Sequence, residues 1–371
     1  MKYWLLYLLP GIFFSCTNEP LDRAAIPLVK VDTVTSFTKN SIPIVGTDNW
    51  VDVNKAQKIG DHYWITVVIS DQGEYRSTLQ EIKADGTPGK EIDPFLINRY
   101  RGGVLGADFY DDKLWIVGSD RILEVDTSHL RISNQYLSQM PDHLAHMLPD
   151  RHRSFRMITD DTYLLALESI NISTTTEQYY SESAEILCIY HKGKLQKELL
   201  GFPEILKAGV SYNPLLLLTQ QSKKHFYVYR HPNNYLDKFN LQGKHLQKIS
   251  FAELAIFEKN RQILPDHLKT DIMDPSLFRQ LRQHLSEHLV SFQADEDKFQ
   301  FIWKSYQGDQ SILHQLSYDL TEKRKVYSNL GTYLIDADII HCSSNDFTDT
   351  FTVISRDNND NYFLIEKKIN L

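Results

Sequence analysis

The stretch DDKLWIVGSDRILEVD, residues 111–126, decides the fold, because it consists of an apolar strand, a tight polar turn and a second apolar strand. Segments of the same kind recur along the chain: GDHYWITVV, DDTYLLALE, KKHFYVYR, EDKFQFIWK and FTDTFTVIS. The second strands of these hairpins are expected to begin at His62, Lys113, Thr162, His225, Lys298 and Asp349, about 50 residues apart wherever no insertion intervenes. A period of this length indicates one array of repeated units rather than several separate domains.

Each repeated unit divides into four short strands. In the second unit we expect these strands near 103–109, 113–118, 121–125 and 131–137. A turn element separates the third and fourth strands: KADGTPGKE, YHKGKLQKE and FNLQGKHLQK carry glycine, whereas VDTSHLRIS and YDLTEKRKV are more degenerate. Glycine in such a turn supplies the positive φ of a tight hairpin. Four-stranded antiparallel units of this period predict the blades of an all-β propeller.

The sequence contains six such units. They begin near Trp50, Gly103, Ser154, Pro214, Leu289 and Thr332. The last unit lacks a fourth strand, whereas AIPLVKVDTVTSF at residues 25–37 is a strand without a unit of its own. We therefore predict a six-bladed β-propeller in which this N-terminal strand closes the last blade and covers an edge that would otherwise be open.

The first 15 residues have the features of a secretion signal. One positive charge at Lys2 precedes an apolar run that is too short to span a bilayer. Cys16 follows the small residue Ser15 at the end of this run, which resembles the lipobox of bacterial lipoproteins. That resemblance implies cleavage before Cys16 and attachment of a diacylglycerol to its thiol; the alternative is an ordinary signal peptide with an incidental cysteine. We expect a signal at 1–15, a tether at 16–24, a propeller at 25–371, and a lipid-anchored location in the cell envelope, with the outer membrane as the expected membrane.

A lipoprotein signal followed by six propeller units with turns of the FNLQGK kind resembles the TolB-like propeller lipoproteins of Bacteroidota. The resemblance covers essentially the whole mature chain and is one of overall pattern. Most proteins of this kind have no assigned activity. The resemblance therefore implies an envelope location and a binding scaffold, and it carries over no catalytic residue.

The charge balance excludes one class of partner. The formal net charge is −8, and removal of Lys2 with the signal makes it −9, without any long basic run elsewhere. Such a chain is poorly suited to a phosphate backbone, so we expect no nucleic-acid binding. Cys188 and Cys342 each lie in an apolar, strand-like stretch and are predicted to be core residues, either as buried thiols or as a disulfide.

Four long excursions interrupt the repeat. They are LSQMPDHLAHMLPDRHR, SINISTTTEQYYSES, GFPEILKAGVSYN and the segment from Ser250 to His288. In a propeller, second-to-third turns and blade-to-blade connections share one end of the channel, here called the top face, so all four excursions are expected there. Loops held by a rigid scaffold commonly carry function, although long loops are also simply tolerated at a surface.

The largest excursion is predicted to be a helical insertion at about 250–288. SFAE at 250–253 has capping-box spacing, and Asp274 before Pro275 suits a second helix start. An apolar stripe at helical spacing follows: Leu277, Phe278, Leu281, Leu285, Leu289 and Phe292. This stripe either packs on the propeller, with its last turn overlapping the fifth blade, or covers a partner.

Polar and aromatic residues precede three of the innermost strands and are candidates for ligand binding. They are Arg99, Tyr100, Arg101, Arg151, His152, Arg153, Tyr212 and Asn213. Their side chains are expected to converge at the upper mouth of the channel, where arginine can hold a carboxylate or phosphate in bidentate fashion. The alternative is that they pair with acidic neighbours such as Asp108, Asp150 and Asp161.

Two histidine patterns raise the question of a metal. HLSEH at 284–288 matches the H-x-x-E-H order of inverted zinc peptidases, and His143, His146 and His152 lie close together in sequence. In neither case does the sequence offer a convincing remaining ligand, so flanking or solvated histidines are the preferred interpretation. No phosphate loop or G-x-S-x-G elbow occurs, and we expect no metal, no cofactor and no catalytic residue.

These patterns favour a non-enzymatic binding scaffold that presents its top loops to an envelope protein or to a small-molecule or glycan ligand. The alternative is a hydrolase or lyase that acts on a glycan or ester in the central channel. For that reading, Asp336 and Asp338 in LIDADII are the nearest approach to a carboxylate pair, although hydrogen-bonded channel residues are the preferred interpretation.

Overall fold

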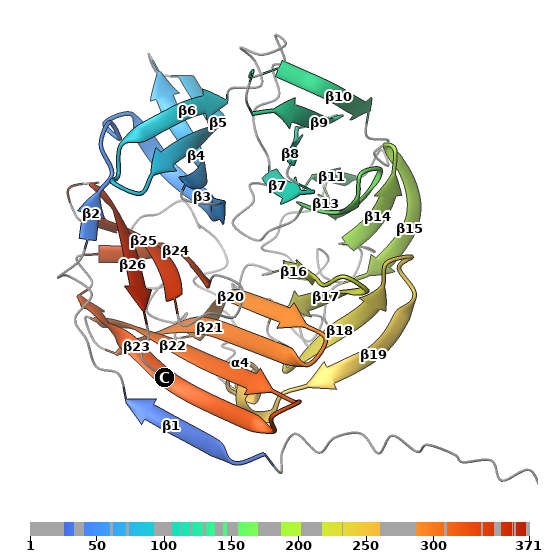
Figure 1. The fold of residues 1–371 in the computed structure, drawn as a ribbon, viewed down its shortest axis with the longest axis vertical. Helices are drawn as coiled ribbons and strands as arrows, with labels where there is room; N and C mark the ends of the chain where they lie inside the picture. The colour runs from blue at the N-terminus through green and yellow to red at the C-terminus, as the bar shows by residue number, and fades with distance from the viewer. Residues whose placement is uncertain are drawn as a thin grey trace, which may run out of the picture.

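The protein is an all-β ring of six sheets around a common centre, shown in Figure 1. The computed structural model describes residues 26–32, 41–59, 62–71, 74–92, 106–111, 113–118, 121–127, 129, 131–137, 144–146, 155–169, 187–201, 217–231, 233–259, 287–307, 310–334, 337–344, 350–357, 359 and 361–368. Each sheet corresponds to one of the predicted units, and the six-bladed propeller is therefore confirmed.

The first three blades follow one another along the chain. Blade 1 consists of β3 (Trp50–Ile59), β4 (His62–Asp71), β5 (Glu74–Lys83) and β6 (Pro88–Ile92). Blade 2 consists of β7 (Gly106–Tyr110), β8 (Lys113–Val117), β9 (Arg121–Asp126) and β10 (Arg131–Leu137). Blade 3 consists of β12 (Phe155–Thr159), β13 (Thr162–Ser169), β14 (Leu187–His191) and β15 (Lys194–Leu200), with the short β11 (Leu144–His146) paired to the far end of β13.

Blades 5 and 6 each take one strand from the N-terminal region, whereas blade 4 is built from consecutive strands. Blade 4 consists of β16 (Leu217–Gln221), β17 (His225–Arg230), β18 (Tyr235–Asn240) and β19 (His245–Ser250). Blade 5 consists of β20 (Glu287–Asp295), β21 (Lys298–Gln307), β22 (Gln310–Asp319), β23 (Arg324–Leu334) and the added β1 (Leu28–Asp32). Blade 6 consists of β24 (Ala337–Ser344), β25 (Thr350–Asp357), β26 (Tyr362–Lys368) and β2 (Ser41–Pro43).

The repeat located the strands closely. Five of the six predicted second strands begin at the predicted residue, and the sixth begins at Thr350, one residue after Asp349. In blade 2, the strands match the predicted ranges to within three residues at each end. The sixth blade begins at Ala337 rather than near Thr332, because β23 extends to Leu334 as the fourth strand of blade 5.

The glycines of the third-to-fourth turns have the predicted conformation. Gly86, Gly193 and Gly243 all have positive φ, between 75° and 84°. These turns also approach the preceding blade: a side chain at Gly193 would collide with the carbonyl of Leu137 in β10, and one at Gly86 with the carbonyl of Pro43 in β2. Glycine is therefore required there by backbone conformation and by close contact between blades.

An N-terminal strand closes the last blade, but it is not the one predicted. β2 pairs antiparallel with β26, with Ser41 opposite Ile365 and Pro43 opposite Phe363. The described part of the predicted closing segment, residues 25–37, forms β1, which instead pairs in parallel with β23 of blade 5. A three-residue strand containing proline sufficed for closure, because an outer strand has a neighbour on one side only.

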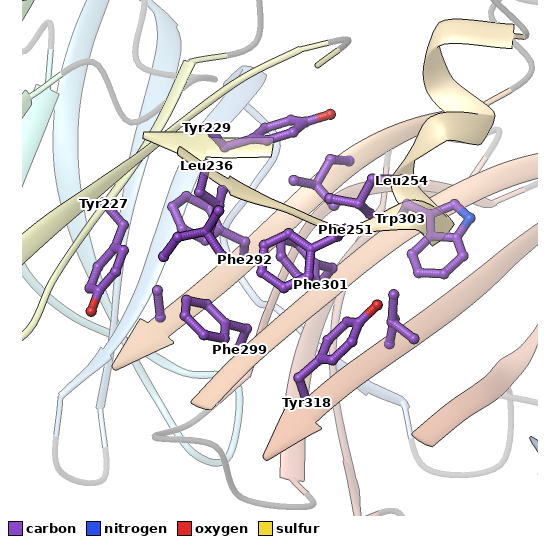
Figure 2. Close-up of a cluster of buried hydrophobic side chains, with 14 of the residues drawn as sticks. Tyr227, Tyr229, Leu236, Phe251, Leu254, Phe292, Phe299, Phe301, Trp303 and Tyr318 are labelled. Atoms are coloured by element: carbon purple, nitrogen blue, oxygen red, sulfur yellow. The ribbon is translucent and has the colours of Figure 1, made fainter. Parts of the chain in front are cut away.

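The core lies between successive blades, because the middle strands are buried on both faces. In β17, Phe226 and Val228 pack towards blade 3, whereas Tyr227 and Tyr229 pack towards blade 5. This two-sided burial explains the nearly continuous apolar run of the strand. Figure 2 shows the cluster between blades 4 and 5, in which Phe251 lies among the rings of Phe299, Phe301 and Tyr318 with centroids 4.8–5.2 Å apart.

The beginning of the helical insertion is short and lies against blade 5. Residues Ala252–Leu254 form the 3-10 helix η3, and Ala255–Lys259 form α4; residues 260–286, with the predicted start at Asp274, lie outside the described residues. Within this part, Leu254 and Phe257 are buried in the cluster shared by blades 4 and 5, so it packs on the propeller.

Two details of the helical prediction are wrong. Ser250 is the last residue of β19, and Phe251 occupies the N-cap without a side-chain hydrogen bond, so no capping box forms. The segment from Glu287 to Asp295 is strand β20, so Leu289 and Phe292 do not belong to a helix. A β-bulge between Leu289 and Ser291 adds one residue to the strand, which places Leu289 and Phe292 on the same face at a spacing that imitates a helix.

Cys188 is buried in β14 as a thiol, as predicted for a core residue. Cys342 lies in β24 of blade 6, directly opposite Val353 in β25. Within the ranges given above, no helix is long and apolar enough to cross a membrane.

Candidate functional site

The predicted ligand-binding residues at the upper mouth of the channel fall between described segments. Arg99, Arg101, Arg151, His152, Arg153 and Tyr212 lie outside the described residues, as do Tyr100, Asn213 and the predicted lipidation site Cys16. The strands that follow them in the chain, β7, β12 and β16, are described and form the innermost strands of blades 2, 3 and 4. These three strands define the geometry of the channel next to the predicted residues.

A polar belt joins these three innermost strands: Asp108, Arg156 and Gln220. The Nη1 atom of Arg156 donates to Oδ1 of Asp108 at 2.9 Å, and its Nη2 atom donates to Oε1 of Gln220 at 3.1 Å. The second carboxylate oxygen of Asp108 accepts the backbone N–H of Met157 at 2.9 Å. Asp108 is buried, whereas the Arg156 side chain keeps 20% of its surface exposed. The belt therefore fixes the register of three neighbouring blades around a guanidinium that solvent still reaches.

Two carboxylates that were possible partners of the predicted arginines already bind other groups. Asp108 binds Arg156, and Asp161 accepts a hydrogen bond from the Tyr136 hydroxyl at 2.8 Å and lies 3.3 Å from the Lys192 ammonium. The Tyr136 hydrogen bond, and after it the Lys192 ammonium, hold the pKa of Asp161 below its usual value. Asp150 lies outside the described residues.

Acidic residues in the first hairpin turn of a blade contact the preceding blade. Asp160 and Asp161, in the turn between β12 and β13, reach Lys113 and Tyr136 of blade 2. Glu296, in the turn between β20 and β21, plays the same part towards blade 4. The sequence analysis did not predict these contacts, although the acidic turns of the repeat, such as TDDT and DEDK, indicate them.

The Glu296 cluster brings a serine, a histidine and a carboxylate together. Oε1 of Glu296 lies 2.7 Å from Nδ1 of His225 and 2.9 Å from the Ser222 hydroxyl, and Oε2 lies 3.3 Å from the Lys238 ammonium. Burial opposes ionisation of Glu296, but the hydrogen bonds from His225 and Ser222 outweigh it and hold its pKa below the usual value. The serine here binds the carboxylate directly, so this arrangement joins two blades and does not have the order of a nucleophile, base and orienting acid.

A second serine–histidine contact lies on blade 5, where Ser305, His314 and Tyr327 form a chain of hydrogen bonds. The Ser305 hydroxyl lies 2.6 Å from Nε2 of His314, and the Tyr327 hydroxyl lies 2.7 Å from Nδ1. This is the contact order that nucleophilic catalysis uses, with a phenol in place of the usual carboxylate. Burial, however, lowers the pKa of His314 to about 4, which makes the ring a weak base at neutral pH. The chain of hydrogen bonds therefore ties three strands of blade 5 together.

Buried polar groups also hold the starting points of two predicted excursions. Arg230, at the end of β17, donates to the carbonyl of Gly201 at 2.8 Å and to Oδ2 of Asp237 at 2.9 Å. Gly201 is the first residue of the predicted excursion GFPEILKAGVSYN, and residues 202–216 lie outside the described residues. At the other excursion, Glu253 in η3 lies 2.7 Å from the Lys325 ammonium and accepts a hydrogen bond from the Tyr318 hydroxyl.

The histidine and carboxylate patterns considered for chemistry are only partly described. His143, His152, His284 and Asp336 lie outside the described residues. His146 lies in strand β11, so the helical turn that would align it with His143 does not form there. His288 lies in β20, so the last residues of HLSEH form a strand and not the predicted helix. Asp338 lies in innermost strand β24, as predicted, opposite Arg356.

In the described part of the chain, no three His, Cys, Asp or Glu residues form a group that could hold a metal ion. The polar constellations found there join blades or strands, and the predicted channel-mouth set keeps its place as a prediction.

No protein-family model matches this sequence, and no curated protein matches it significantly. Three solved structures illustrate the similarity in fold. The β-propeller domain of the Trilobed protease from Pyrococcus furiosus is 10% identical, with 86% of this chain and 95% of that chain covered and a TM-score of 0.40. The acylaminoacyl peptidase of Pyrococcus horikoshii is 9% identical, with 90% and 53% covered and a TM-score of 0.40. The Nup133 β-propeller domain of Vanderwaltozyma polyspora is 9% identical, with 85% and 92% covered and a TM-score of 0.38.

The aligned part of the acylaminoacyl peptidase is thus about half of that protein. Similarities at this level lend the present chain no activity or partner. The strand order of this chain classifies it as a six-bladed β-propeller.

Proposed function

We propose that this protein is a lipid-anchored propeller of the cell envelope that acts as a non-enzymatic binding scaffold. Its binding surface is the top face, where the excursions between blades and the predicted residues Arg99, Arg101, Arg151, His152, Arg153 and Tyr212 meet. The partner is an envelope protein or a small-molecule or glycan ligand that carries a carboxylate or phosphate group for these arginines. Cys16 carries the anchor.

The observation that supports this proposal most strongly is the fixation of two excursions where they leave the propeller. The Gly201 carbonyl is held by the buried Arg230, and the segment after Ser250 is held by Phe251, Leu254 and Phe257 in the core. A buried guanidinium and three buried apolar side chains constrain backbone that a merely tolerated loop would leave unconstrained. Loops that begin from fixed points on a rigid scaffold are suited to present a binding surface.

The test is an affinity pull-down of the lipidated protein from its native envelope. Beside the wild type we would use a variant with Arg101, Arg151, His152 and Arg153 all changed to alanine. A matched control changes the exposed Lys223, Lys224 and Lys244 to alanine, which removes a similar charge from turns of blade 4. A partner retained by the wild type and the control and lost from the arginine variant supports the proposal. Retention of the same partner by all three proteins contradicts the assignment of the binding face.

A second variant tests the fixed excursion directly. Phe257→Ala removes the ring that packs against Trp303, with centroids 6.2 Å apart, and leaves every proposed contact residue in place. We expect weaker retention of the partner with the six blades still folded by far-UV circular dichroism. If Phe257→Ala retains the partner as well as the wild type, the insertion does not contribute to binding, and only the arginine-bearing connections remain as the proposed surface.

A further inference from the structure

The outermost strand of blade 5 differs in direction from the outer strands described for the other five blades, which all pair antiparallel with their neighbours. β1 runs parallel to β23, with Leu28 opposite Lys325 and Asp32 opposite Asn329. It forms the outer edge of the ring at this blade (Figure 1). Ile26, just before it, is only 5% exposed, so the chain is packed against the propeller at this residue.

The outer surface at β1 exposes adjacent apolar side chains. Leu28 is 38% exposed and Val29 is 50% exposed. The other exposed large apolar side chains of the described segments stand apart from this pair, two near the start of blade 1 and one each on blades 2 and 4: Val45, Val51, Leu137 and Leu246. Because successive side chains of a strand point to opposite faces, Leu28 and Val29 lie on the two sides of β1 and flank its free edge. Exposed apolar side chains on both sides of one edge strand are the feature that calls for an explanation.

Basic side chains accompany this apolar pair. Lys30 follows it on β1, and Lys323 and Arg324 are exposed in the turn that leads into β23, where β1 begins to pair. The same hairpin carries two acidic residues, the exposed Glu322 and Asp319, which lies opposite Arg324 and 3.2 Å from the Lys298 ammonium. Three basic groups therefore stand beside one carboxylate that has an ion-pair partner and one that is exposed, in a chain with a formal net charge of −8. We call Leu28, Val29, Lys30, Lys323 and Arg324 the rim patch. Apolar side chains with lysine and arginine around them suit the surface of a bilayer that contains anionic lipids.

Chain length connects the rim patch to the proposed anchor. Nine residues lie between Cys16 and Ile26. Even fully extended, this stretch of chain spans no more than about 35 Å. A lipid attached at Cys16 therefore keeps the start of β1 within about 35 Å of the membrane surface. The first described strand after the proposed anchor, β1, pairs with β23 of blade 5, so blade 5 is the blade nearest to the anchor along the chain.

We propose that the rim patch rests on the membrane surface, so that the propeller stands on the edge of blade 5 with its channel axis parallel to the membrane. This inference rests on the proposed anchor at Cys16 and adds the orientation of the molecule and the lipid surface as a second contact. In this orientation both ends of the channel open to the solution along the membrane, and the top face is presented sideways.

The test measures depth in the membrane at chosen positions of the lipidated full-length protein. A cysteine that carries an environment-sensitive fluorophore is introduced at Val29, at Leu137 of blade 2 or at Leu246 of blade 4, all of which are exposed. The proteins are reconstituted into vesicles of phosphatidylethanolamine and phosphatidylglycerol that contain a nitroxide-labelled lipid. We expect quenching at position 29 to exceed quenching at positions 137 and 246 several-fold. Equal quenching at the three positions overturns the inference.

Charge reversal gives a second readout that leaves β1 unlabelled. Lys30→Glu, Lys323→Glu and Arg324→Glu together should reduce vesicle contact, seen as faster rotational diffusion of the anchored protein, and should remove its sensitivity to salt. The control Lys194→Glu, Lys223→Glu and Lys244→Glu carries the same charge change on turns of blades 3 and 4. Equal effects of the two variants contradict a specific role of the rim patch.

Failure of the anchor is distinguishable from failure of this orientation. The measurement is flotation of the protein with vesicles. If the Cys16→Ala variant floats as well as the wild type, lipid anchoring is contradicted, and the inference falls with it. If the wild type floats and Cys16→Ala does not, the anchor is intact. If quenching at position 29 is then no stronger than at the other positions, only the orientation is contradicted.

Discussion

Arg156 in blade 3 binds Asp108 in blade 2 through a hydrogen bond of 2.9 Å between Nη1 and Oδ1, and the same carboxylate also accepts the Met157 N–H. One buried acid thus fixes both the side chain and the backbone of the next blade. Contacts of this kind, together with the apolar clusters, determine how six similar sheets become one ring.

Removal of one member of this pair should destabilise the ring strongly. Arg156→Met leaves the buried Asp108 carboxylate without its countercharge, and we expect a loss of about 3 kcal/mol in the free energy of unfolding. Asp108→Asn combined with Arg156→Met should recover part of that loss, because no uncompensated charge remains. Urea unfolding of the two single variants and the double variant measures the coupling. Additive losses would show that the two residues act independently.

Replacement of a turn glycine should cost more where the neighbouring blade is in contact. Gly193→Ala meets both a φ of 80° and the carbonyl of Leu137, so we expect a loss of more than about 1 kcal/mol and a shift of blades 2 and 3. Gly46 is the matched control: its φ is 75°, and a Cβ there would come no closer than 4.0 Å to the Pro88 side chain. Thermal unfolding of both variants compares the effect of backbone strain alone, at Gly46, with that of strain and steric collision together, at Gly193. Equal losses of stability would contradict the contact between Gly193 and Leu137.

His314 should make the protein less stable as the pH falls below neutrality. Burial lowers its pKa to about 4, whereas the unfolded chain has a histidine pKa of about 6.5. Between these values the unfolded state binds the proton first, so the free energy of unfolding should decrease as the pH falls from about 6.5 to about 4. We expect about 2 kcal/mol, after a discount for solvent screening of this partly exposed ring.

The comparison for that prediction is His314→Gln, which should be less stable at neutral pH but should lose less stability across this range. His129, whose side chain is 68% exposed, provides the control variant His129→Gln. Urea unfolding at a series of pH values measures both effects. A wild-type profile that does not slope between pH values of about 4 and 6.5 would contradict the buried, neutral state of the ring.

Glu296 should have its effect at lower pH. Because its pKa is held below the usual value of about 4.5, the contact between blades 4 and 5 is fully present above that value and is lost as the pH falls through the lower, folded-state pKa. Glu296→Gln should therefore reduce stability at neutral pH and make the profile flatter below a pH of about 4. Glu322→Gln changes an exposed carboxylate on another turn and serves as the control. Parallel profiles for wild type and Glu296→Gln would contradict the ionic contact.

Most of the fold could be predicted because one hairpin pattern is repeated. The start of β8 at Lys113 and the positive φ of Gly193 both follow from local sequence, since they depend on apolar alternation and turn chemistry. The closing strand could not be predicted in the same way. Ser41–Pro43 is short and carries little β-propensity, and it is specified by its position beside β26 rather than by its own composition.

The helical reading of the segment around Leu289 shows a second limit. Leu289 and Phe292 share a face because of a bulge, which no periodicity rule can distinguish from a helical turn. Interactions such as Glu253 with Lys325 also could not be predicted, because they join residues from different elements whose approach depends on the finished ring. The candidate residues at the channel mouth are supported by chain order alone and stay a prediction.

Closure of the ring by β2 affects the order in which the protein folds. Ser41 pairs with Ile365, so blade 6 closes only when two segments that lie far apart in the sequence meet. Loop closure over such a separation is slow, and until it occurs β26 presents an unpaired strand edge to its surroundings. The open ring is thus the form most exposed to mispairing and proteolysis, and the time that the chain spends in it depends on the three residues of β2.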